Sequence, residues 1–122
     1  RILKPGGKLF IGVPNIDSVW ARMFGEHWWY FGLPVHTFNY DHRTLPQMLG
    51  RHGFRVTDVR WNSDYASVIG SLQIRRNARK GLRSSDGPLL RNKLAVVLGH
   101  VAAKLSDWLR RGDCIEVIAT RD

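Results

Sequence analysis

The chain has 122 residues, of which 43% are hydrophobic and 24% are charged, a composition typical of one globular domain with a modest core. It carries 19 Lys and Arg against 10 Asp and Glu, and this net charge of +9 favours anionic partners such as nucleic acid, anionic lipid or an acidic protein. No apolar run reaches the roughly 18 residues of a membrane span, and the single cysteine, Cys114, excludes an intramolecular disulfide and fits a cytoplasmic protein.

A glycine turn and a short apolar run open the chain. The Pro-Gly-Gly sequence at residues 5–7 favours a tight turn, because proline presets φ and glycine tolerates positive φ. Residues 9–13 are apolar throughout, which predicts a strand buried between two layers, as in parallel α/β sheets. Pro14 ends this strand, and Asn15 and Asp17 are residue types that begin helices. We therefore expect a helix directly after the carboxyl end of the strand, where open α/β sheets bind ligands.

A short helix and an aromatic loop are expected next. Apolar residues recur at helical spacing from Ile16 to Phe24, and Gly25 suits a helix stop. Residues 26–40 have no regular period and are rich in aromatic side chains. Such a loop either covers the carboxyl end of the sheet as a wall or lid for a substrate, or packs as a second small core.

A helix, a strand and a basic segment form the middle of the chain. Residues 41–53 predict a helix, with Thr44–Gln47 in the form of a capping box, and residues 54–61 partly alternate, as a half-buried strand does. Residues 67–80 predict a short helix that leads into a basic cluster. This cluster is either a solvated face or a patch for an anionic substrate or membrane, whereas RNA is disfavoured because no aromatic residues interleave with it. Its members are Arg75, Arg76, Arg79, Lys80 and Arg83.

The last third of the chain predicts a long amphipathic helix over residues 89–110 and a final strand over residues 114–119. We expect the broad apolar face of the helix to cover the sheet. Because basic residues border that face, the alternative is a helix that lies on a membrane surface.

The glycine turn, the first strand and its Pro-Asn exit resemble the fifth-strand region of class I S-adenosylmethionine-dependent methyltransferases that act on small molecules. The resemblance continues through His36, residues 38–41, Thr44-Leu45 and Gly53-Phe54, and returns over residues 108–119. It covers most of this chain but only the C-terminal half of such a domain. It implies an α/β fold with a partial Rossmann-like sheet of three strands and flanking helices, in which the last strand is antiparallel and inserted between the other two.

The same resemblance suggests residues for a site that binds the methyl acceptor. It places His36 near the acceptor pocket, as a general base or an orienting group, although a lone histidine there more often ties the loop to a backbone carbonyl. Asn15, Trp29 and Tyr40 are the candidates for substrate binding, Asn15 because it follows the carboxyl end of the first strand. No third ligand joins His36 and His42 at a suitable spacing, so no metal site is predicted.

The glycine-rich loop that holds S-adenosylmethionine in this family has no counterpart here, since no Gly-x-Gly follows a strand and precedes a helix. We therefore expect a fragment that lacks the donor-binding half and is inactive alone. Its first strand would keep a free edge, suited to a homo-oligomer or swapped assembly. The alternative is a complete small basic α/β module that binds a membrane surface or nucleic acid. Hydrolases and kinases are disfavoured, because the sequence has no catalytic triad, paired acids or phosphate loop.

Overall fold

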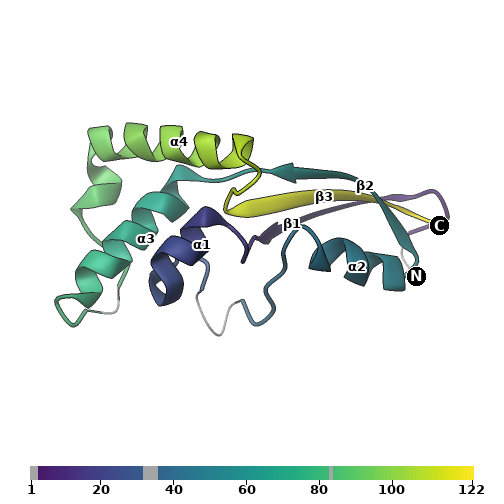
Figure 1. The fold of residues 1–122 in the computed structure, drawn as a ribbon, viewed down its shortest axis with the longest axis horizontal. Coiled ribbons are helices and arrows are strands. Elements are labelled where there is room, and N and C mark those ends of the chain that lie inside the picture. Colours follow the sequence, from purple (N-terminus) through teal and green to yellow (C-terminus); the bar gives the residue numbers. More distant parts are fainter. Residues whose placement is uncertain (1–2, 32–35, 83) are drawn as a thin grey trace.

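The computed structural model describes residues 3–31, 36–82 and 84–122, and Figure 1 shows its helices and strands. Residues 32–35 of the predicted aromatic loop and Arg83 of the basic cluster lie outside the described residues. In chain order the elements are β1 (Lys8–Pro14), α1 (Val19–Phe24), η1 (Gly25–His27), α2 (Thr44–Arg51), β2 (Phe54–Trp61), α3 (Tyr65–Ala78), η2 (Pro88–Arg91), α4 (Lys93–Trp108) and β3 (Cys114–Arg121). Of these, η1 and η2 are short 3-10 helices.

The three strands form one sheet in the order β1-β3-β2, and β3 is antiparallel to both of its neighbours. The prediction that the last strand is antiparallel and lies between the other two is therefore confirmed. The strand also runs further than predicted, because Thr120 and Arg121 still pair with residues of β2. A β-bulge between Val56 and Asp58 shifts the register of β2 against β3.

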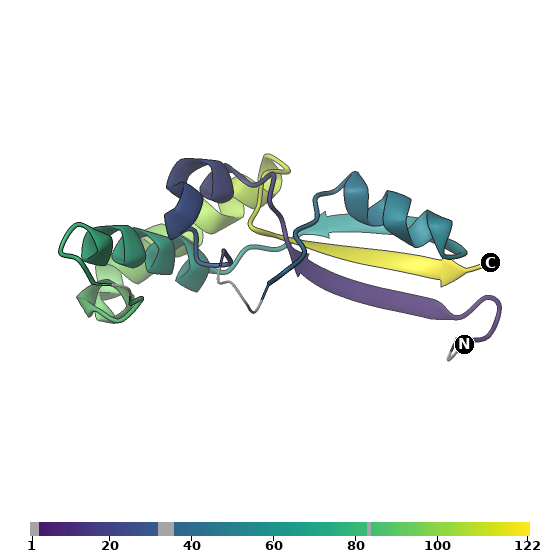
Figure 2. The same ribbon diagram turned by 90° about the horizontal axis from the view of Figure 1, so that it is seen from below.

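One face of the sheet is covered by α2, whose Leu45 and Leu49 pack against Ile115 and Val117 of β3. Figure 2 shows α2 beside the strands, while α1, α3 and α4 gather beyond one end of the sheet. On the opposite face, Phe10 of β1 is 69% exposed. The prediction that both faces of the first strand are buried is therefore wrong for the part of the chain that the structure describes.

Helix α2 begins at Thr44 rather than at residue 41, and its N-terminus is held by a different pair from the one predicted. Oδ1 of Asp41 accepts hydrogen bonds from the N–H groups of Arg43 (2.8 Å) and Thr44 (2.7 Å). Oγ1 of Thr44 in turn accepts a hydrogen bond from the N–H of Asp41 at 2.9 Å. The reciprocal pair is thus Asp41 with Thr44, not Thr44 with Gln47. For α1, the capping residue is Ser18 rather than Asn15 or Asp17.

Asp41→Ala is expected to lower the free energy of unfolding by about 1–2 kcal/mol at neutral pH. Burial by itself raises the pKa of Asp41, but the N–H groups of Thr44 and Arg43 and the Thr44 hydroxyl lower it from 3.8 to about 2. The folded state keeps this carboxylate charged to a lower pH than the unfolded state does. Its stabilisation is therefore complete well above pH 3.8 and is lost as the pH falls through about 2. Urea unfolding should show a smaller difference between variant and parent at pH about 3 than at neutral pH.

The prediction that the apolar face of the long helix covers the sheet is wrong, because the large apolar residues of α4 face away from it. The buried residues of α4 are small, namely Gly99, Ala103 and Ser106. The helix packs on α3 near Gly99, and Oγ of Ser106 accepts a hydrogen bond from Nε1 of Trp20 in α1 at 3.0 Å. The contact is close, since a Cβ placed on Gly99 would lie 2.7 Å from Cγ1 of Ile69 in α3. Small side chains allow the two helices to approach in this way, and the large apolar side chains of α4 consequently face outward.

Candidate functional site

A buried carboxylate, Asp113, lies where α1, α3, the aromatic segment and the start of β3 meet. The residue is 0% exposed. Its Oδ1 accepts hydrogen bonds from Nε1 of Trp28 (2.7 Å) and Oγ of Ser18 (3.0 Å), while its Oδ2 is hydrogen-bonded to Oγ of Ser67. The backbone carbonyl of Asp113 accepts a further hydrogen bond from the N–H of Asn15 at 2.7 Å. The hydrogen bonds of Asp113 therefore hold the aromatic segment, through Trp28, against α1 and α3.

The surroundings of Asp113 favour its neutral form. Burial raises the pKa of its carboxyl, the hydrogen bonds from Ser67, Trp28 and Ser18 offset part of that rise, and the charge of Asp107 adds to it. The hydroxyl of Ser67 also lies 2.7 Å from the carbonyl oxygen of Asp64. A protonated Asp113 can donate from Oδ2 to Oγ of Ser67, which leaves the single Ser67 proton for Asp64.

A second carboxylate, Asp107 of α4, continues this network. It accepts hydrogen bonds from the N–H (2.9 Å) and Oγ (2.6 Å) of Ser63, and Oγ of Ser63 accepts one from the N–H of Asp113 at 2.6 Å. The network links α4 to β3 through the loop before α3. Nothing local in the sequence marks it, because Asp113 is 46 residues from Ser67 and 95 residues from Ser18.

The predicted site residues Asn15 and Tyr40 lie side by side, joined by a backbone bridge. Asn15 is only 1% exposed. Its Nδ2 donates to the carbonyl of Gly112 (2.9 Å) and its Oδ1 accepts from the N–H of Asp17 (3.1 Å). The amide of Asn15 thus holds the turn after β1 inside the protein, and a role in binding an acceptor stays a prediction.

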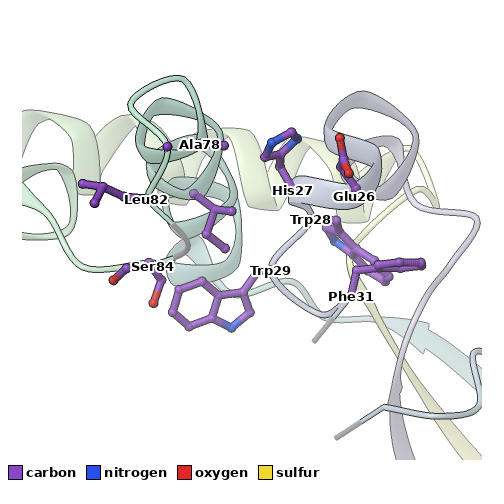
Figure 3. Close-up of a pocket in the computed structure, with 11 residues that line it drawn as sticks. Glu26, His27, Trp28, Trp29, Phe31, Ala78, Leu82 and Ser84 are labelled. Carbon is purple, nitrogen blue, oxygen red and sulfur yellow. The ribbon is translucent and has the colours of Figure 1, made fainter. Parts of the chain in front are cut away.

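Trp29 lies apart from this pair and lines a hollow of about 990 Å³ between η1 and the C-terminal part of α3. Figure 3 shows Trp28 and Phe31 at one end of the hollow, Leu82 and Ser84 at the other, and the ring of Trp29 between them. The Trp29 indole lies directly on α3, because a Cβ placed on Gly70 would be 2.0 Å from its Cε3. The lining combines these aromatic rings with polar side chains such as Glu26 and His27, a mixture that suits a flat or ring-shaped small molecule with polar groups.

His36 is half-buried and connects to the hollow through a series of aromatic contacts. Its ring centroid lies 6.1 Å from that of Tyr30, edge to face, and Tyr30 packs in the same manner on Trp28 at 5.6 Å. Burial and a hydrogen bond with Cys114 raise the pKa of Tyr30, and burial likewise raises the pKa of Cys114. Tyr30 and Cys114 are therefore both protonated at neutral pH, so neither serves there as a base or a nucleophile.

Within residues 3–31, 36–82 and 84–122, no three His, Cys, Asp or Glu side chains gather in a way that could hold a metal ion. Over the same ranges, every helix is too short or too polar to cross a membrane. No family model, curated protein or solved structure matches this chain.

Proposed function

We propose that this chain is the C-terminal half of an S-adenosylmethionine-dependent methyltransferase domain that acts on a small molecule. The observation that carries the proposal is the strand order β1-β3-β2, with β3 antiparallel to both neighbours. That order occurs together with the glycine turn before β1 and the Pro-Asn exit after it, the features in which the sequence resembles this family. As an edge strand, β1 also presents backbone groups suited to pairing with a further strand.

The turn after β1 does not fit S-adenosylmethionine. A nucleotide-type ligand at such a turn needs free backbone N–H groups, and here they are already used. The N–H of Asn15 donates to Asp113, that of Ile16 to Tyr40 (3.0 Å) and that of Val19 to Arg111 (3.0 Å). In this proposal the donor therefore binds to a segment outside this chain, and the chain contributes the wall on the acceptor side.

The acceptor side consists of the aromatic hollow and the residues that adjoin it. Trp29 offers a ring against which an acceptor could stack, and Tyr40 lies where the loop returns to the sheet. His36 is the candidate that removes a proton from the acceptor or orients it, because Tyr30 and Cys114 hold their own protons.

Isothermal titration calorimetry with S-adenosylmethionine tests the proposal directly. The chain alone is expected to show no micromolar binding. A longer product of the same gene, extended before Arg1, is expected to contain a Glu/Asp-x-Gly-x-Gly motif and to bind the donor. Micromolar binding to the chain alone, or a start codon directly before Arg1, would contradict the proposal.

His36→Asn in the longer product is expected to lower kcat about 100-fold or more, as the loss of a general base does. The measurement is release of S-adenosylhomocysteine with a panel of phenolic and sugar acceptors. His52→Asn is the matched control, because His52 lies at the exposed end of α2, where its Nδ1 contacts the carbonyl of Met48 at 2.8 Å. Equal rates for the two variants would remove His36 from the proposed site.

A further inference from the structure

The outward face of α4 carries a continuous stripe of large apolar side chains, here named the α4 ridge. The positions recur three, four and seven residues apart, so they share one side of the helix. An exposed apolar stripe of this length usually marks a contact surface. The exposed fractions are 68% for Leu94, 58% for Val97, 59% for Leu98, 53% for Val101, 55% for Leu105 and 80% for Trp108.

A cluster of arginines lies on the exposed side of α3. Arg75, Arg76 and Arg79 line a hollow of about 490 Å³ together with Leu72 and with Leu89 of η2. All three arginines are exposed, and none of them takes part in the ion pairs of the described residues. Their guanidinium groups are therefore free to bind an external anion.

The arginine cluster lies near the start of α4, because its hollow is lined by Leu89 of η2, the turn that leads into this helix. Tyr65 of α3 packs on His100 of α4, with ring centroids 4.2 Å apart. Leu72, in the arginine hollow, is two helical turns from Tyr65 and lies on the same side of α3. Lys93 and Lys104 are on the His100 side of α4 by the same spacing. Cations thus border the apolar ridge along its His100 side and near its N-terminal end, and one of them, Lys104, is paired with Asp107 at 3.3 Å.

This part of the chain holds almost all of its net charge. Residues 75–111 contain ten Lys and Arg and two Asp, a net charge of +8 in a chain whose total is +9. A second copy of the chain would bring the same charge to the contact and be repelled. Nucleic acid would match the charge but would leave the apolar side chains in water. An anionic lipid surface satisfies both, because it offers phosphates to the cations and hydrocarbon to the ridge.

We propose that the α4 ridge docks on an anionic lipid bilayer. In this arrangement α4 lies in the plane of the interface, its apolar side chains enter the headgroup boundary, and the bordering cations contact lipid phosphates. Trp108 suits this position, since tryptophan prefers the boundary between hydrocarbon and headgroups. The inference is independent of the proposed methyltransferase function, because it uses neither the sheet nor the aromatic hollow.

Vesicle co-sedimentation and tryptophan fluorescence of the chain test this proposal. We expect it to sediment with vesicles of equal parts phosphatidylcholine and phosphatidylglycerol, and not with phosphatidylcholine alone. Added salt should weaken binding, and the emission should shift to shorter wavelength as Trp108 leaves water. Absence of binding to the anionic vesicles would overturn the proposal.

Two pairs of variants distinguish the contribution of the ridge to vesicle binding from that of the cations. Val101→Glu is expected to lower the vesicle partition coefficient at least about 10-fold, whereas Phe38→Ser, at a 78% exposed residue elsewhere, should leave it unchanged. The double variant Arg75→Glu/Arg79→Glu is expected to lower it about 25-fold or more. Lys4→Glu/Arg51→Glu, with the same change in charge at exposed positions elsewhere, should have a clearly smaller effect.

Three results would overturn the assignment to lipid. The first is a loss of vesicle binding that is equal in the variants and their controls. The second is tighter binding to duplex DNA than to anionic vesicles at the same salt concentration, with Val101→Glu having no effect. The third is a concentration-dependent dimer, measured by light scattering, that Val101→Glu dissociates. Because the substituted side chains are exposed, the far-ultraviolet circular dichroism of each variant should match that of the parent.

Discussion

Asp113→Ala is expected to lower the free energy of unfolding by about 3–5 kcal/mol, measured by urea unfolding at neutral pH. The substitution removes the acceptor for Nε1 of Trp28 and Oγ of Ser18, which are 2% and 0% exposed as residues. Each buried donor left without a partner costs about 1–3 kcal/mol, and the space vacated by the carboxyl adds to the loss. A cost below about 1 kcal/mol would contradict the central position given to Asp113.

Asp113→Asn separates the shape of this residue from its charge. The amide keeps an oxygen where Trp28 and Ser18 donate, and its nitrogen can donate to Oγ of Ser67 while that hydroxyl donates to the carbonyl of Asp64. We therefore expect the asparagine variant to stay within about 1 kcal/mol of the parent at neutral pH. A loss as large as that of alanine would show that Asp113 is charged in the folded state.

The pH dependence of the Asp113→Asn variant provides an independent check. The pKa of Asp113 is raised above 3.8 in the folded state. Over the pH range between 3.8 and the folded pKa, the folded state therefore keeps a proton that the unfolded state has released. Stability from this group is greatest below pH 3.8 and declines as the pH rises through the folded pKa. The asparagine variant lacks this decline, so its stability relative to the parent should increase with pH over that window.

Gly70→Ala is expected to destabilise the chain by about 1–3 kcal/mol, even though alanine is the better helix former. The new Cβ would lie 2.0 Å from Cε3 of Trp29, so the indole must leave its place on α3. Urea unfolding measures the cost. Gly50→Ala in α2 is the matched control, because a Cβ there meets nothing within 4 Å and should stabilise the helix by about 0.5–1 kcal/mol.

A double-mutant cycle identifies the cause of this expected loss. In a Trp29→Ala background the added methyl group meets open space, so Gly70→Ala should change from destabilising to neutral or stabilising. A cost that persists in that background would mean that Trp29 does not pack on Gly70. Since Trp29 lines the aromatic hollow, the cycle also tests the geometry of the candidate site.

The candidate site was predicted only in part from the sequence. Trp29 lines the hollow, because a loop with so many aromatic side chains must bury some of them against a helix, and its role in binding stays a prediction. Asn15 was selected for its place after β1, but its amide is used by the backbone of Gly112 and Asp17. Sequence position alone does not reveal whether a polar side chain already has partners.

Local sequence patterns are enough to predict several of the helices and strands. Proline, glycine and apolar patterns act over a few positions, so they predict β1, β2 and a helix over residues 41–53, of which the structure forms Thr44–Arg51. Two larger features, the network around Asp113 and the outward orientation of the α4 ridge, depend on contacts between residues far apart in the sequence. Helical period shows which residues share a face but not which face is buried. In α4 the small-residue face is buried, because Gly99 and Ala103 allow the close approach of α3 that the larger side chains would prevent.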